Sequence, residues 1–161
     1  MTTAEFNKTV DLYADNLFRF ILKNIRDEAV AQDIVQDTFE KLWRKVEDIE
    51  YKTAKSYMFS AGYRTMIDAI RKNKNQGDLD DVNEDLHSTS EQYNDVQEVL
   101  QLAIKKLPEI QRSVIMLRDY EGYAYDEIGK ITGLKESQVK VYIFRARKAL
   151  KQYIGNLEMV V

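Results

Sequence analysis

Apolar residues recur every three or four positions along most of the chain, which is the pattern of helices with one buried face. The first run comprises Phe6, Val10, Tyr13, Leu17, Phe20, Ile21 and Ile25. A second run extends from Val30 to Val46, and a third from Tyr57 to Ile70. Acidic residues Asp27 and Glu28 suit the start of the second helix. The pattern predicts three helices within residues 5–74, with a loop over 47–53.

The periodicity stops after Lys74 and resumes near Asp95. Residues 75–94 are rich in Asp, Asn, Ser and Gln, and their apolar residues are isolated, so they read as a flexible linker. Residues 95–156 return to helical spacing, and Pro108 suits the first turn of a helix. We therefore expect an all-α fold: two small helical domains, residues 5–74 and 95–156, joined by a flexible acidic linker.

The amino-acid composition limits the kinds of catalytic and metal site that the chain can form. The 161 residues include no Cys and one His, which argues against disulfides, thiolate nucleophiles, His-based triads and Cys or His metal clusters. No phosphate-binding glycine loop is present either. We expect no cofactor, no metal and no enzymatic activity. No apolar run approaches the ~18 residues that cross a bilayer, and no basic-then-apolar leader is seen, so the expected location is cytoplasmic.

The net charge of −3 hides an uneven distribution. Residues 1–74 carry 13 basic and 12 acidic side chains, residues 75–98 carry none and 8, and residues 99–161 carry 11 and 7. A strongly acidic connector thus separates two segments with a slight basic excess. Such asymmetry bears on partners, whereas the total charge bears mainly on solubility.

A helix-turn-helix is predicted near the end of the chain. Gly129 supplies a small residue where two helices touch, and Gly133 tolerates a left-handed turn. Residues 130–151 hold 7 basic side chains and 1 acidic one, which is typical of a recognition helix that binds DNA phosphates. A solvated basic helix packed on a bundle is the alternative. The predicted DNA-facing residues are Ser137, Gln138, Lys140, Val141, Tyr142, Arg145, Arg147 and Lys148.

Two weaker surfaces lie in the first part. Residues 52–74 hold 6 basic side chains and 1 acidic one among several aromatic residues, a mixture that suits stacked single-stranded DNA but also core aromatics with a solvated rim. The stripe of Asp33, Asp37 and Glu40 is either a solvated helix face or a docking surface for a basic or amphipathic partner.

Three motifs resemble those of extracytoplasmic-function sigma factors of bacterial RNA polymerase. Residues 31–43 (AQDIVQDTFEKLW) are similar to the polymerase-docking helix of sigma region 2. Residues 107–118 (LPEIQRSVIMLR) resemble the opening of region 4, and residues 144–150 (FRARKAL) resemble its end. The motifs occur in the family's order and span nearly the whole chain.

The resemblance implies a sigma factor that directs core RNA polymerase to promoters and initiates transcription. It implies region 2 in residues 5–74, a linker in 75–94 and region 4 in 95–156. Core polymerase would be bound by Asp33, Gln36, Asp37 and Glu40. The −10 promoter element would be bound by Lys52, Lys55, Tyr57, Phe59, Tyr63, Arg64, Arg71 and Lys72. The recognition helix would read the −35 element, and an anti-sigma factor is a further expected partner, without membrane insertion.

The chain departs from the family pattern at several positions. Many members carry Arg-Asn where this chain has Tyr63 and Arg64, and a basic residue where it has Ser60. Val141 stands where a small polar residue is common, so it would contact a thymine methyl group. Two other classes remain: a stand-alone helix-turn-helix regulator that binds DNA without polymerase, and a helical enzyme.

Overall fold

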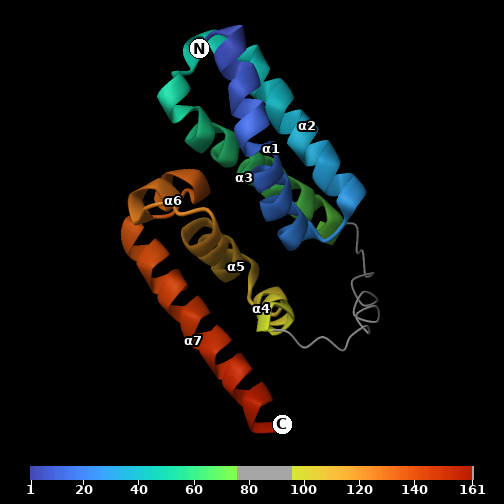
Figure 1. The fold of residues 1–161 in the computed structure, drawn as a ribbon, viewed down its shortest axis with the longest axis vertical. Coiled ribbons are helices and arrows are strands. Elements are labelled where there is room, and N and C mark those ends of the chain that lie inside the picture. The colour runs from blue at the N-terminus through green and yellow to red at the C-terminus, as the bar shows by residue number, and fades with distance from the viewer. Residues whose placement is uncertain (76–95, 161) are drawn as a thin grey trace.

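The computed structural model describes residues 1–75 and 96–160, and within those ranges it contains helices and no strand (Figure 1). The predicted all-α fold is confirmed. The helices form two groups: α1 to α3 come from the first part of the chain and α4 to α7 from the last. The predicted linker falls outside the described residues, apart from Asn75 at the end of α3.

The first group is a three-helix bundle whose helix starts are set by local hydrogen bonds. Helix α1 (Thr3–Ile25) begins at a capping box in which the Glu5 amide donates to Thr2 Oγ1 at 3.1 Å and the Thr2 amide donates to Glu5 Oε1 at 2.9 Å. Asp27 caps α2 (Glu28–Arg44) by accepting from the Val30 amide at 3.2 Å. Two 3-10 turns, Val46–Asp48 and Tyr51–Thr53, occupy the predicted loop before α3 (Ala54–Asn75).

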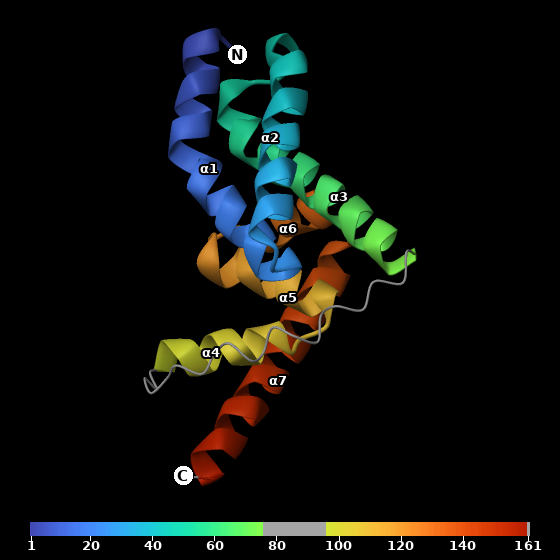
Figure 2. The same ribbon diagram turned by 90° about the vertical axis from the view of Figure 1, so that its right-hand side faces the viewer.

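The second group carries the helix-turn-helix. Helices α4 (Val96–Lys105) and α5 (Glu109–Ile115) lead into a π-helical turn, η5 (Met116–Tyr120). Helix α6 (Tyr125–Thr132) and helix α7 (Glu136–Val160) follow, and α7 extends away from the rest of the molecule toward the C-terminus (Figures 1 and 2). Pro108 is the N-cap residue of α5, so it lies one residue before the first turn in which the sequence predicts it.

Both glycines of the predicted helix-turn-helix have the predicted roles. Gly133 ends α6 with a φ of 85°, in the left-handed region that glycine adopts without steric cost. A Cβ atom on Gly129 would lie 2.8 Å from the backbone carbonyl oxygen of Leu134, so any side chain there would push the two helices apart.

Gly129 therefore gives a stability prediction. Gly129→Ala should lower the free energy of unfolding by about 1–3 kcal/mol, because the contacting atom is backbone and cannot rotate away. Gly155→Ala is the matched control: it is also helical, a Cβ there meets nothing within 4 Å, and it should raise stability by about 0.5–1 kcal/mol. Denaturant unfolding of both variants checks this, and equal effects from the two would contradict the close packing.

The two groups pack on each other through one continuous hydrophobic core. Helix α3 lies against α6 and α1 against α5, as the two views show (Figures 1 and 2). Phe59 of α3 joins the groups: its ring is 5.9 Å from that of Phe20 and 5.5 Å from that of Tyr123. We call this interface between the α1–α3 group and the α4–α7 group the seam. At its other end, buried Arg112 donates from Nε to Asn24 Oδ1 at 2.8 Å. The limits of two separate domains thus stay a prediction.

Candidate functional site

The acidic face of α2 is accessible over a shallow groove. Asp33, Gln36 and Glu40 are exposed, and Asp37 is partly exposed. Together with apolar residues of α1 and α2 and with residues of α3 they line a groove of about 810 Å³. Two of the carboxylates make only exposed pairs one turn along the same helix, Asp37 with Lys41 at 3.6 Å and Glu40 with Arg44 at 3.7 Å. Such pairs contribute little to stability, so a partner can replace them at small cost.

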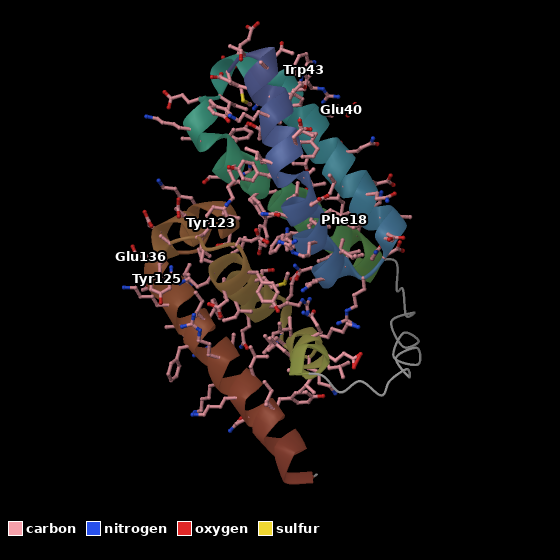
Figure 3. All side chains as sticks on the ribbon, viewed as in Figure 1. Phe18, Glu40, Trp43, Tyr123, Tyr125 and Glu136 are labelled. Atoms are coloured by element: carbon pink, nitrogen blue, oxygen red, sulfur yellow. The ribbon has the colours of Figure 1, made fainter. Side chains whose placement is uncertain are left out.

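The same end of the molecule exposes an aromatic residue that sequence reasoning left out of the site. Trp43 is 47% exposed, and its ring stacks edge-on against Phe6 at 5.0 Å. Figure 3 shows Glu40 and Trp43 on the end of α2 that points away from the α4–α7 group. The sequence places Trp43 one turn from Glu40 of the acidic stripe. Its apolar character nevertheless predicts the buried face of the helix, so the sequence alone does not assign it to this surface.

The residues predicted to bind the −10 element differ in exposure and form three groups. Lys52, Arg64, Arg71 and Lys72 are exposed, whereas Lys55 and Tyr57 are partly buried. Phe59 is 0% and Tyr63 7% exposed, so neither lies on an open surface in this packed arrangement. The alternative of core aromatics with a basic rim describes these two residues. Burial and the charge of Glu109 raise the pKa of Tyr63 to about 12, which keeps its hydroxyl protonated.

A small basic pocket lies beside the exposed part of this surface. Lys41 of α2 and Lys45, the C-cap residue of α2, line it together with Tyr57, Ala61 and Arg64 of α3, around a volume of about 170 Å³. Cations beside an aromatic ring suit a phosphate and a base of single-stranded DNA. The two lysines are not among the residues predicted for this site, although a spacing of four residues places side chains on the same side of a helix.

The outer face of α7 collects most of the predicted −35 residues. Ser137, Gln138, Lys140, Val141, Arg145 and Lys148 are all exposed. Phe144 lies among them and is 67% exposed, an apolar side chain that sequence reasoning had not assigned to this face. Tyr142 is partly buried against the core, and Arg147 forms an ion pair with Asp119 of η5 at 2.7 Å. Arg147 therefore ties α7 to the turn, and only part of its donor capacity remains for DNA.

The start of α7 is held close to α6. Figure 3 labels Tyr125 of α6 and Glu136 of α7 at this end of the group. The ammonium of Lys140 pairs with Glu136 at 3.7 Å and lies 5.7 Å from the centre of the Tyr125 ring. These contacts hold Lys140 near the helix-turn-helix while leaving it exposed.

A buried carboxylate lies at the seam between the two groups. The side chain of Glu121 is 2% exposed, and its Oε2 accepts from Arg19 Nη2 at 3.5 Å. Burial raises the pKa of Glu121, while the charges of Arg19 and Lys55 lower it. Its second oxygen, Oε1, is buried with no partner among the described residues.

The raised pKa predicts how stability depends on pH. A carboxyl whose folded pKa lies above its unfolded value takes up a proton on folding, so its contribution to stability falls as pH rises from 4.5 through the folded pKa. Glu121→Gln removes this contribution. The free energy of unfolding of Glu121→Gln, relative to that of the unmodified chain, should thus be higher at neutral pH than near pH 4.5. Denaturant unfolding of both proteins at both values measures the difference, and a difference that does not change with pH would contradict the prediction.

Among residues 1–75 and 96–160, no helix is both long and apolar enough to span a membrane. Over the same residues, no group of three or more His, Cys, Asp or Glu side chains is placed to hold a metal ion.

Comparison with known proteins gives two family matches in the order of the two helical groups. Residues 9–76 match sigma-70 region 2, and residues 97–150 match sigma-70 region 4. The chain is 27% identical to the ECF RNA polymerase sigma factor SigM of Bacillus subtilis, over 87% of this chain and 89% of SigM. It is 29% identical to the sigma factor SigV of the same bacterium, over 86% and 84%.

A solved structure supports the same assignment. The sigma factor RpoE of Bartonella quintana, crystallised with the anti-sigma factor NepR, matches with a TM-score of 0.77 and 25% identity over 93% of this chain and 96% of RpoE. Both sigma regions, their order and their helices are therefore present in one chain. The protein belongs to the sigma-70 family, as a sigma factor of the extracytoplasmic-function type.

Proposed function

We propose that this sigma factor directs core RNA polymerase to specific promoters through three surfaces, one on α2, one around α3 and one on α7. The observation that carries the proposal is the succession of regions 2 and 4, with the recognition helix α7 presenting an exposed basic face. The chain takes part in transcription initiation as a specificity subunit, and we assign it no catalytic step and no cofactor.

Polymerase docking is assigned to the α2 face. Its carboxylates Asp33, Asp37 and Glu40 are held only by solvent or exposed pairs, so they are available to a basic or amphipathic helix of the polymerase. Trp43 extends the surface with an aromatic residue of the kind that anchors interfaces.

Promoter contacts are assigned to α3 and α7. For the −10 element, we assign the basic rim of α3 together with Lys55, Tyr57, Phe59 and Tyr63, whose partial or full burial requires the two helical groups to separate first. For the −35 element, we assign the exposed α7 face, with Arg145 and Lys140 reaching bases or phosphates and Val141 and Phe144 contacting thymine methyl groups.

The domain limits and partners follow from the same proposal. Region 2 occupies residues 5–74 and region 4 residues 95–156, with the acidic linker of 75–94 between them. Since the structural relative RpoE was crystallised with an anti-sigma factor, we include an anti-sigma factor among the partners. Transcription places the chain in the cytoplasm without membrane insertion.

A gel shift with and without core polymerase distinguishes this function from that of a stand-alone regulator. A sigma factor should shift promoter DNA strongly only as holoenzyme, and weakly and salt-sensitively alone, because each region contacts little DNA by itself. Tight binding by the chain alone to a two-fold symmetric site would favour the regulator.

The docking surface gives a separate prediction. Asp37→Lys should weaken binding to core polymerase several-fold, because it places a like charge opposite a basic partner. Asp37 is partly exposed, so the free energy of unfolding should change by less than about 0.5 kcal/mol. Asp11→Lys is the control, as Asp11 is exposed on α1 and does not line the α2 groove. Pull-down titration measures both variants, and equal affinities would refute the assignment.

A further inference from the structure

The turn between η5 and α6 inserts two side chains into the α1–α3 group. Gly122, with a φ of 77°, lets the chain reverse between Glu121 and Tyr123. Tyr123 is 4% exposed as a residue, and the Glu121 side chain 2%. Figure 3 shows Tyr123 where α6 meets α3. The helix-turn-helix group thus places an aromatic ring and a carboxylate, one residue apart, inside the seam.

The partners of these two side chains come from α1 and α3, and the two from α3, Lys55 and Phe59, are assigned to the −10 element. The Tyr123 ring lies edge-on to that of Phe59, with centroids 5.5 Å apart at an angle of 70°. The Lys55 ammonium is 4.8 Å from the centre of the Tyr123 ring and 5.2 Å from that of Tyr13. Arg19 pairs with Glu121, and the positive charge of Lys55 also acts on this carboxyl.

We propose that Glu121 and Tyr123 occupy the place of one nucleotide of the −10 single strand, as an internal mimic that free DNA must displace. A nucleotide offers an aromatic ring beside an anion, and this turn offers the same pair of groups to Phe59 and Lys55. Stacking on an aromatic ring and attraction to a cation are the interactions that bind single-stranded DNA. The inference rests on the proposed function, since it takes Lys55 and Phe59 as −10 contacts.

Two polar atoms of the turn lack hydrogen-bond partners in the seam, which makes it easier for a DNA strand to replace the turn. The Tyr123 hydroxyl and Glu121 Oε1 are buried without a hydrogen-bond partner among the described residues. Buried polar groups without partners weaken the interface that contains them. Opening the seam returns both groups to water, so a bound strand or the polymerase can separate the two helical groups more easily than if the contact were apolar.

Single-stranded DNA binding by the free full-length chain tests the mimic. The probe is a short fluorescein-labelled DNA of random sequence, followed by anisotropy. Tyr123→Ala and Glu121→Ala each remove side-chain contacts across the seam. Each should tighten binding about tenfold, because a competent state populated to ~10% or less lowers apparent affinity by that fraction. Tyr123→Phe keeps the ring and removes the unpaired hydroxyl, so it should bind no better than the unmodified chain. Circular dichroism establishes that each variant is folded, and Glu121→Ala serves if Tyr123→Ala does not fold.

Two controls separate the mimic from other effects. Glu136→Gln removes an exposed carboxylate of the same helical group, and an equal gain there would show a general charge effect and overturn the mimic. Lys55→Ala in the holoenzyme tests the −10 assignment itself through open-complex formation. If Lys55→Ala impairs the holoenzyme while Tyr123→Ala and Glu121→Ala leave free-chain binding unchanged, the mimic is wrong and the proposed function stands. If Lys55→Ala has no effect on open complexes, the −10 assignment fails, and the mimic fails with it.

Discussion

Arg112→Ala is expected to lower the free energy of unfolding by about 3 kcal/mol or more, the sum of two hydrogen bonds from a charged donor at ~1.5–3 kcal/mol each. Arg112 is 8% exposed, and it donates from Nε to Asn24 Oδ1 at 2.8 Å and from Nη1 to the Leu107 carbonyl at 3.0 Å. Burial and the charge of Arg26 lower the pKa of Arg112, whereas the charge of Glu109 raises it.

The loss should exceed that of a simple truncation because it leaves partners unsatisfied. Asn24 is itself 7% exposed, and its amide already donates to the Phe20 carbonyl at 2.9 Å. Without Arg112, its Oδ1 keeps only the longer hydrogen bond from Ser113 Oγ at 3.5 Å. Denaturant unfolding measures the change. Arg145→Ala is the control, an exposed arginine whose removal should alter stability by less than about 0.5 kcal/mol. A loss for Arg112→Ala no larger than for the control would contradict the buried link between α1 and α5.

The second large effect concerns promoter affinity. Arg145→Ala should weaken holoenzyme binding to the −35 element by about 1–3 kcal/mol, because that is the usual loss when a bidentate contact between arginine and guanine is removed. Arg145 is exposed on the outer face of α7 and, among the described residues, pairs with no carboxylate, so its guanidinium is available. Its own contact is with the Tyr142 ring, 6.0 Å from the guanidinium carbon.

A second basic residue on the same helix shows whether the effect is specific to bases. Lys151 is exposed further along α7. If Lys151 contacts a phosphate, Lys151→Ala should weaken holoenzyme binding to all DNA sequences alike. The slope of log affinity against log salt concentration should then fall in magnitude by about one. Arg145→Ala should instead relax base preference at one position of the −35 element. Normal affinity and normal base preference for Arg145→Ala would refute its role.

Much of the fold could be predicted because its determinants are local. Spacing of apolar residues located α1, α2 and α3, and two glycines with distinct requirements located the helix-turn-helix. Gly129 is needed for a close approach and Gly133 for a positive φ, and the sequence carries both within five residues. Residue-type patterns of this kind do not depend on distant parts of the chain.

The seam could not be predicted because its partners are far apart in the sequence. Phe59 meets Tyr123, and Arg112 meets Asn24. Helix α3 packs on α1 and α2 with one face and on α6 with another, so an aromatic residue that periodicity alone leaves at the rim becomes core. Arg112 belongs to a residue type that is usually exposed, and only its three-dimensional partners reveal it as buried.

The central claim, that this chain gives core polymerase its promoter specificity, is tested most directly by run-off transcription over a library of upstream regions. Core polymerase is assayed with the chain, without it, and with Asp37→Lys. The account predicts transcripts from a defined subset of regions sharing −35 and −10 elements, present only with the chain and reduced with Asp37→Lys. The same transcripts with and without the chain would contradict the account.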